Sequence, residues 1–113
     1  MVYERGNIVL VNFNPQKKVQ EVGKVRPAII LSDTMLNDVL DLVSVVALTT
    51  HLIDDAEPLR IRLLARENLK EESDAMIEQL RCVSKSRIGA CIGYVSEEEM
   101  QKIETGIKLM LGL

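Results

Sequence analysis

The sequence predicts a mainly β fold, a small and strongly curved sheet or barrel with one C-terminal helix. Three observations lead to this prediction. Short apolar or alternating segments recur along most of the chain, polar turns separate them, and only the segment 96–112 has helical spacing. A chain of 113 residues is large enough for one hydrophobic core and too small for two, so we expect residues 1–113 to form a single domain.

The first strand is predicted at 8–13, where side chains alternate between two faces until Asn14-Pro15 ends the run. The polar segment 16–24 that follows is expected to be a surface loop between the first two strands. It is longer than a tight hairpin needs. Because such loops are enriched in function, this one is a candidate lid or binding loop.

Arg26 stands at the junction between this loop and the apolar run 28–31. Pro27 has a fixed φ and disfavours helix for the residue before it, so we expect Arg26 on extended backbone. The run has no polar member, which suits a strand buried on both faces, although so short a run is also compatible with a buried helix. A guanidinium at the mouth of a buried strand is a well-aimed anion donor; the alternative is an arginine that only caps a strand end in solvent.

Further short elements are predicted between this strand and the C-terminal helix. They are a helical turn at 32–38, an apolar, β-branched strand at 42–48 that opens into Thr49-Thr50-His51, an alternating, half-exposed strand at 58–64, a fifth strand at 75–83 in which Glu78, Gln79 and Arg81 are interspersed, and a turn at 85–86.

The C-terminal helix is the most clearly marked element. Ser96 followed by Glu99 is a capping box, in which the serine accepts from the N3 amide and the glutamate reaches back to the serine N–H. Gly112 supplies a left-handed stop. The apolar stripe of this helix covers either the barrel or a twin subunit, and the sequence leaves both open. The stripe consists of Met100, Ile103, Ile107, Met110 and Leu111.

The formal net charge is −3 at pH 7, which counts against nonspecific binding to nucleic acid through a general basic surface. A local basic groove is still compatible with the sequence, because Lys17, Lys18, Lys24 and Arg26 fall within ten residues. No apolar run approaches the length of a membrane span and no N-terminal signal is visible, so we expect a cytoplasmic protein that does not bind membranes.

Most catalytic signatures are missing from the sequence. It has one histidine, His51, and no HExxH, GxSxG, P-loop or GxGxxG motif. His51 is either a proton carrier or, as a lone loop histidine more often is, part of the polar surface. Cys82 and Cys91 form no metal-binding pattern and are expected to be reduced and buried, and no metal ion or other cofactor is expected. Phosphate chemistry, in which an arginine and a hydroxyl neutralise a phosphoryl group, fits the remaining side chains best.

Five pieces of the sequence stand in a characteristic order. They are Arg5-Gly6-Asn7-Ile8-Val9 leading to Phe13-Asn14-Pro15; Lys24-Val25-Arg26-Pro27-Ala28; Ala47-Leu48-Thr49-Thr50; Ile77-Glu78-Gln79-Leu80-Arg81 leading to Ser84-Lys85-Ser86-Arg87-Ile88; and 96–113 as a closing helix. Each piece is weak alone. Together, in a chain of this length, they resemble the MazF, PemK and Kid family of toxin endoribonucleases from bacterial toxin–antitoxin systems.

The resemblance implies a small SH3-like barrel of about five to seven strands with a C-terminal α-helix, like the MazF, PemK and CcdB toxins. It implies a homodimer whose interface groove takes single-stranded RNA, and a cognate antitoxin protein that occupies the same groove. It also implies sequence-specific, metal-independent cleavage of mRNA, which inhibits translation and growth. In that reaction the ribose 2′-OH attacks the adjacent phosphate and leaves 2′,3′-cyclic phosphate and 5′-OH ends.

The family's pattern carries three catalytic positions over to this chain: Arg26 as the catalytic arginine, Thr49 as the catalytic threonine and Glu21 as an acidic residue of the first loop. Arg26 would neutralise the phosphate, Thr49 would donate to a nonbridging oxygen, and Glu21 would accept the 2′-OH proton. Because the chain has no tryptophan, stacking on bases falls to Phe13 or to arginine planes. RNA contacts are expected from Phe13, Lys17, Lys18, Lys24, Thr50, Glu78, Gln79 and Arg81.

Two other functions remain open for the same fold. A related toxin family uses this fold to poison DNA gyrase without cutting RNA. The other function is that of a catalytically silent binding module, which keeps dimer formation and has no activity. Cys82 and Ser84 replace a threonine and an aspartate that relatives often carry, so no base preference carries over to this chain.

Overall fold

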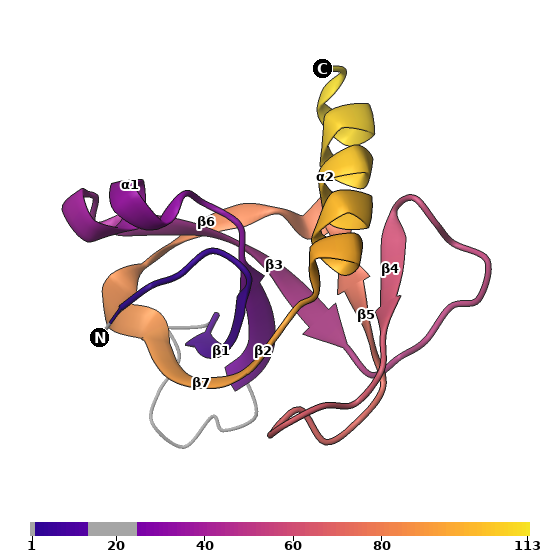
Figure 1. Ribbon diagram of the computed structural model, residues 1–113, viewed down its shortest axis with the longest axis horizontal. Coiled ribbons are helices and arrows are strands. Elements are labelled where there is room, and N and C mark those ends of the chain that lie inside the picture. Colours follow the sequence, from indigo (N-terminus) through magenta and orange to yellow (C-terminus); the bar gives the residue numbers. More distant parts are fainter. Residues whose placement is uncertain (1, 14–24) are drawn as a thin grey trace.

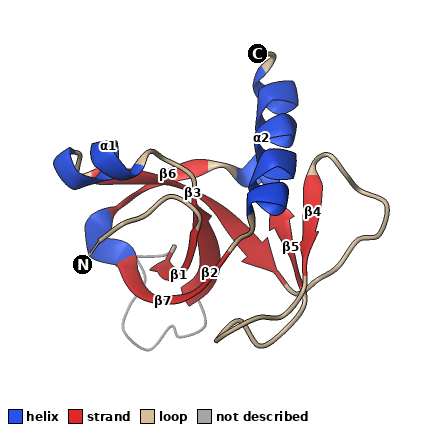
Figure 2. Ribbon diagram, viewed as in Figure 1, coloured by secondary structure: helices blue, strands red, loops and turns tan. Residues whose placement is uncertain are grey.

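The computed structural model describes residues 2–13 and 25–113, and within them it has seven strands and a C-terminal helix (Figure 2). The predicted mainly β class is therefore confirmed. The strands are β1 (Asn7–Asn12), β2 (Val25–Ile30), β3 (Leu42–Thr49), β4 (Arg60–Leu63), β5 (Ser73–Met76), β6 (Arg81–Ser84) and β7 (Ile88–Tyr94). The helices are α1 (Thr34–Val39) and α2 (Glu97–Leu111), with the 3-10 turns η1 (Ile77–Gln79) and η2 (Lys85–Arg87).

All the strand pairs are antiparallel, in the order β4-β5-β3-β2-β1-β7, and β6 is also paired with β3. Strand β3 crosses the middle of the molecule. On one edge it pairs with β2; on the other its first half pairs with β6 and its end pairs with β5. In Figure 1, β1, β2 and β7 curl into one lobe, while β4 and β5 stand on the other side beside α2.

The prediction of one strand over 75–83 is wrong, because the chain divides there into β5, η1 and β6. Leu48 of β3 faces Ala75, and Val45 faces Arg81. The partner chain therefore advances six residues while β3 advances three. The excess forms η1, in which Ile77 is fully buried. Such an insertion bends a strand and increases its twist, so one straight strand is replaced by two short ones.

The central strands bury both of their faces, as the apolar run 28–31 predicted. Ile29 and Val46 belong to one cluster with residues of α2, whereas Ala28 and Ile30 belong to a second cluster on the other face. Strands with two buried faces need apolar residues at consecutive positions, and the sequence of β2 supplies them. The second cluster also contains Val9, Val11, Val43, Val45, Val83 and Ile88.

The C-terminal helix is confirmed, including both of its ends. Ser96 Oγ accepts from the N–H of Glu99 at 3.1 Å, Glu99 accepts from the N–H of Ser96 at 2.8 Å, and Gly112 has φ of 74°. Met100 and Ile103 are buried in the first cluster, so this half of the stripe covers the sheet. The other end projects away from the strands (Figure 1), and Leu109, Leu111 and Leu113 are exposed there.

The remaining predicted elements agree with the structure in part. The turn at 32–38 is α1, capped by Asp33, and the strand at 58–64 is shortened to β4. Strand β7, which pairs with β1, was not predicted. The expectation of buried cysteines is wrong, since Cys82 is exposed and Cys91 is half-buried; both are free thiols. Among the described residues, no helix has the length and hydrophobicity that crossing a membrane would require.

Gly106 provides the first test of this packing. It is buried where α2 crosses the connection to β4, and a Cβ built on it would collide with the carbonyl oxygen of Pro58. Alanine at this position gains about 1 kcal/mol of helix propensity, but an extra carbon forced against a backbone oxygen costs about 3 kcal/mol, the upper end of the usual range for overpacking. We therefore expect Gly106→Ala to lower the free energy of unfolding by about 2 kcal/mol in urea denaturation.

Gln101→Ala, on the exposed side of the same helix, is the matched control and should change stability by less than about 0.5 kcal/mol. A Gly106→Ala variant as stable as the wild type would contradict the close contact between α2 and Pro58.

Candidate active site

Arg26 and Thr49 line one hollow of about 550 Å³, which we call the Thr49 pocket. Arg26 lies in β2 and Thr49 is the last residue of β3. The paired residues of these antiparallel strands end at Ala28 and Ala47, and the same register continued by two positions leads to Arg26 and Thr49. Two residues far apart in the sequence are thus brought together by strand pairing.

The Thr49 hydroxyl has a defined orientation. Its Oγ1 accepts from the backbone N–H of His51 at 3.1 Å, an Asx-like turn that the Thr49-Thr50-His51 sequence forms locally. Since the oxygen already accepts from this N–H, its own hydrogen can be donated to a ligand in the pocket. Thr49 is half-buried and Arg26 is exposed. The pair therefore offers a hydroxyl donor and a guanidinium to one ligand.

Arg26 also lines a second hollow of about 340 Å³, which we call the Phe13 pocket. Its other walls are Phe13, Ala47, Met76, Gln79 and Arg81. The guanidinium carbon of Arg81 lies 5.1 Å from the centroid of the Phe13 ring, a cation–π distance. Arg26 therefore stands between a pocket with hydroxyl groups and a pocket with an aromatic ring under an arginine plane.

The other residues predicted for the site are only partly assembled. Thr50 lies in the Thr49 pocket and Gln79 lies in the Phe13 pocket, whereas Glu78 lines neither pocket and has Arg60 Nε at 4.0 Å. Both Glu78 and Gln79 belong to η1 instead of a strand. Glu21, Lys17, Lys18 and Lys24 lie outside the residues that the structure describes.

Several residues of the Thr49 pocket were not singled out from the sequence. Asn68, Lys70 and Glu71 reach it from the segment between β4 and β5. His51, which the sequence left as either a proton carrier or polar surface, lines it as well. This segment folds back through a bridge between Arg66 and Leu69, and the N–H of Asn68 donates to the carbonyl of Ile92 in β7 at 2.9 Å. No motif marks it; a polar stretch between two strands was the one available signal.

A bidentate ion pair fastens this segment to α2. Arg66 donates to both carboxylate oxygens of Glu99, at 2.5 and 2.7 Å, and both side chains are largely buried. Burial alone would raise the pKa of Glu99, but the hydrogen bonds from Arg66 and from the Ser96 N–H outweigh it, so the pKa lies below the usual value. Glu99 thus takes part in the capping box and, through Arg66, holds the segment that lines the Thr49 pocket.

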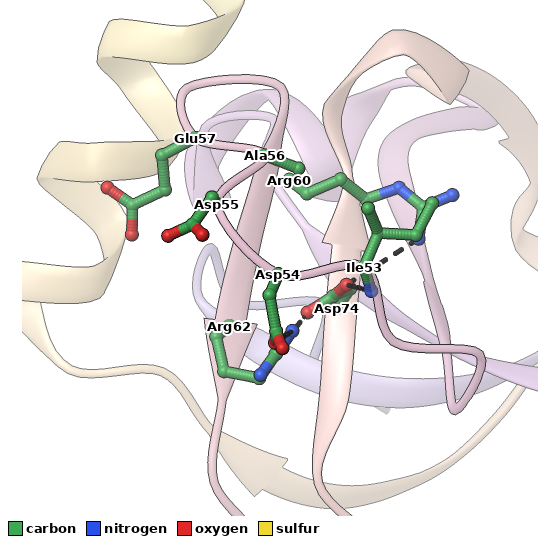
Figure 3. A pocket seen from close by; sticks show the side chains of 8 residues that line it. All are labelled: Ile53, Asp54, Asp55, Ala56, Glu57, Arg60, Arg62 and Asp74. Atoms are coloured by element: carbon green, nitrogen blue, oxygen red, sulfur yellow. Dashed lines mark hydrogen bonds and ion pairs between the residues drawn. The ribbon is translucent and has the colours of Figure 1, made fainter.

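A third hollow of about 670 Å³, the Asp74 pocket, lies beyond Thr49 and contains none of the predicted site residues (Figure 3). Asp74 is 1% exposed and accepts hydrogen bonds from Arg62 Nε at 2.5 Å and from the Ile53 N–H at 2.9 Å. Burial alone would raise the pKa of Asp74. The two hydrogen bonds lower the pKa by more than burial raises it, so the pKa lies below that of an ordinary aspartate. The bonds to Asp74 and Asp54 raise the pKa of Arg62.

Within 2–13 and 25–113, no group of three or more His, Cys, Asp or Glu side chains is arranged to hold a metal ion. Most polar side chains of the Thr49 pocket can donate hydrogen bonds, and among the described residues that line it Glu71 is the one acidic group. The donors are Arg26, Thr49, Thr50, His51, Asn68, Lys70 and Ser73. Such groups suit an anionic ligand with phosphate-like oxygens.

Comparison with known proteins identifies relatives over almost the whole chain. A family model described as the PemK-like, MazF-like toxin of type II toxin-antitoxin systems matches residues 4–111. The chain is also similar to the endoribonuclease MazF of Staphylococcus saprophyticus, with 26% identity over 110 residues, which are 96% of this chain and 91% of that protein.

Solved structures with the same fold include a chain of the MazE–MazF crystal structure (Form-II) from Deinococcus radiodurans, with a TM-score of 0.78, 19% identity and coverage of 100% of this chain and 98% of that chain. The Mycobacterium tuberculosis toxin MazF-mt6 has a TM-score of 0.79, 19% identity and coverage of 95% and 97%. A mycobacterial endoribonuclease in complex with its cognate antitoxin has a TM-score of 0.76, 23% identity and coverage of 97% and 95%. At these identities the likeness concerns the fold.

The Arg66–Glu99 pair makes a pH-dependent prediction. Glu99→Gln replaces a charge-assisted bond with a neutral one and should lower stability at pH 7 by about 1 kcal/mol. Because the pKa of Glu99 is lowered by folding, its stabilisation is present above the ordinary glutamate pKa of about 4.3 and is lost as pH falls through the lower folded value. Urea denaturation between pH 7 and pH 2 should therefore show the variant and the wild type converging at the acid end.

Glu98→Gln is the control from the same turn, because Glu98 is exposed. It should change stability by less than about 0.5 kcal/mol at pH 7. A gap between Glu99→Gln and the wild type that stays constant over the whole pH range would contradict the role given to the ion pair.

Proposed function

The chain belongs to the PemK-like, MazF-like toxins of type II toxin–antitoxin systems, and on this premise we propose that it is an endoribonuclease that cleaves single-stranded mRNA. The observation that supports the proposal best is that Arg26 and Thr49 line one pocket. A guanidinium and a hydroxyl donor around one hollow suit a phosphodiester. Residues 1–113 would act as a single toxin domain.

The proposed reaction is an internal transfer of the phosphate. The ribose 2′-oxygen forms a bond to the adjacent phosphorus while the bond from phosphorus to the 5′-oxygen breaks, so the products carry 2′,3′-cyclic phosphate and 5′-OH ends. Negative charge builds on the nonbridging oxygens in the transition state. Arg26 would neutralise it and Thr49 would donate a hydrogen bond to it, which requires no metal ion.

Proton transfer would contribute less than this charge stabilisation. Glu21, in the segment 14–24, is the proposed acceptor of the 2′-OH proton, and a carboxylate is a weak base at neutral pH. The 5′-oxygen takes up a proton as it leaves, from water or from Arg26, whose always-charged guanidinium is a reluctant donor. Loss of Glu21 should therefore slow the reaction less than loss of Arg26.

The Phe13 pocket would hold a base next to the reacting phosphate. Arg81 lies over one face of the Phe13 ring beside Arg26, so a base could stack on the outer side of the guanidinium or on the opposite face of the ring. Gln79, in the same pocket, has an amide that can hydrogen-bond a base edge. The remaining proposed RNA contacts are Thr50, Glu78, Lys17, Lys18 and Lys24.

The proposed partners are a second copy of the chain and a cognate antitoxin. The projecting end of α2 exposes Leu109, Leu111 and Leu113 at 62%, 55% and 85%, and such a surface is commonly covered in an assembly. Similar proteins have been crystallised as a MazE–MazF complex and with a cognate antitoxin. An antitoxin segment that enters the RNA groove would inhibit cleavage by competition.

Arg26→Ala tests the proposed reaction. Purified protein is incubated with a long RNA in EDTA, and the ends of the fragments are sequenced and analysed for cyclic phosphate. Removing one positively charged stabiliser of the transition state typically lowers kcat by about 10²–10³-fold, so we expect that loss for Arg26→Ala. Lys102→Ala removes the same charge from an exposed position of α2 outside both pockets and should cleave as fast as the wild type.

The outcome also separates the two alternative functions. A wild type that cuts no RNA while Arg26→Ala remains toxic to cells indicates a gyrase poison. A wild type that neither cuts RNA nor is toxic indicates a silent binding module. Cleavage that leaves 5′-phosphate ends contradicts the 2′-OH mechanism.

Arg81→Met tests the stacking surface, because methionine keeps an apolar chain and loses the guanidinium plane. Losing one base stack costs about 1–3 kcal/mol, so KM should rise about tenfold with a smaller change in kcat. Lys85→Met is the control, since Lys85 Nζ lies 5.3 Å from the centroid of the Tyr3 ring in a cation–π pair that lines neither pocket. Equal KM values for Arg81→Met and the wild type would exclude Arg81 from RNA binding.

A further inference from the structure

Arg60 connects the buried carboxylate of Asp74 to the segment that carries Thr49. We propose that Arg60, held by Asp74, is a positioning residue that keeps Thr49–His51 in the conformation required for RNA cleavage; this proposal rests on the endoribonuclease function proposed above. Arg60 and Asp74 line neither the Thr49 pocket nor the Phe13 pocket, so both would act through the backbone that follows β3.

Strand register brings these side chains to one face. Asp74 in β5 pairs with Thr49 in β3 and with Arg62 in β4, and Arg60 lies two residues from Arg62 on the same face of β4. Ile61 and Leu63 point to the opposite face, where they are buried in the first cluster. The alternation of arginine and apolar residues in β4 therefore puts two guanidinium groups beside one carboxylate, as Figure 3 shows.

The carboxylate of Asp74 is an anchor because it cannot remain buried alone. At 1% exposure an unpaired aspartate would lose most of its hydration, and breaking a buried pair is strongly destabilising. Arg62 Nε and the Ile53 N–H donate to it, and Arg60 Nη1 lies 3.6 Å from its Oδ2. These contacts fix both arginines and tie Ile53, in the connection between β3 and β4, to β5.

Arg60 links the Asp74 carboxylate to the backbone of the proposed active site. Its Nη1 donates to the carbonyl oxygen of His51 at 3.2 Å, and the N–H of His51 donates to Thr49 Oγ1 at 3.1 Å. The peptide groups on both sides of His51 are therefore held, one by Arg60 and one by the hydroxyl of Thr49. Movement of His51 would turn the Thr49 hydroxyl away from the pocket or leave it without its orienting partner.

Arg62 is a natural comparison within the same cluster. It binds Asp74 and, through Nη2 at 3.0 Å, the exposed Asp54, whereas the hydrogen bond to the His51 carbonyl comes from Arg60. Arg62 thus ties Asp74 to the outer loop, whereas Arg60 ties it to the active-site segment. A purely structural cluster would make the two arginines equivalent for catalysis once stability is taken into account.

The test compares Arg60→Met, Arg60→Lys and Arg62→Met in the full chain. Misplacing a catalytic group by about 1 Å can cost up to about 10²-fold in rate, so Arg60→Met should lower kcat at least about tenfold and leave KM within about twofold. Arg60→Lys keeps the charge near Asp74 but loses the planar fork, so its Tm should recover more than its kcat. Arg62→Met should lose Tm and keep kcat within about twofold, measured well below the Tm of every variant.

Amide hydrogen exchange gives a second readout that does not depend on RNA. The His51 amide should exchange faster in Arg60→Met than in Arg62→Met or the wild type, because its neighbouring carbonyl is no longer held. If kcat falls in proportion to Tm in all three variants, or if His51 exchange is unchanged in Arg60→Met, the positioning role is overturned. If the wild type cuts no RNA, the endoribonuclease proposal fails, and the His51 exchange rate still decides whether Arg60 holds the segment.

Discussion

Strand β3 is the constraint on which both the fold and the site depend. It pairs with β2 along one edge and with β6 and then β5 along the other, so it belongs to both lobes of the sheet. A strand shared in this way must have apolar side chains on both faces, which Val43 to Leu48 provide apart from Ser44. The last residue of the same strand is Thr49, so the geometry that joins the two lobes also sets the position of the hydroxyl in the site.

The site combines rigid and anchored parts. Arg26 and Thr49 are supplied by paired strands, which hold side chains more precisely than loops do. The loops that complete the Thr49 pocket are held by buried or half-buried ion pairs, Arg66 with Glu99 on one side and Arg60 with Asp74 on the other. These ion pairs outside the pocket thereby stabilise the backbone segments that line it.

Local patterns predicted most of the fold. The alternation at 8–13, the apolar runs at 28–31 and 42–48 and the capping box of α2 depend on neighbours in the sequence, and all appear in the structure. The break at η1 could not be predicted, because it arises from the different registers of β5 and β6 on β3. Strand β7 was missed because glycines at 89 and 93 weaken its strand pattern.

The sequence also predicted the two central residues of the candidate site, but not the residues that hold them in place. Arg26 was marked by Pro27 and the apolar run after it, and family resemblance pointed to Thr49; the structure adds that strand pairing puts them together. Asp74 and Lys70 gave no such signal, since acidic and basic residues in polar stretches usually face solvent, and the capping box marked Glu99 but not its ion pair. Their roles depend on tertiary partners, Arg60 and Arg62 for Asp74 and Arg66 for Glu99, that no local pattern encodes.

The central claim is that the guanidinium of Arg26 and the hydroxyl of Thr49 act on one phosphodiester. A double-mutant cycle on kcat/KM for RNA cleavage, with Arg26→Ala, Thr49→Val and the double variant, tests it most directly. If both groups stabilise the same transition-state charge, the losses are not additive in free energy, and the double variant is scarcely slower than Arg26→Ala alone. Losses in the two single variants that multiply in the double variant would show that the residues act independently and would contradict this account.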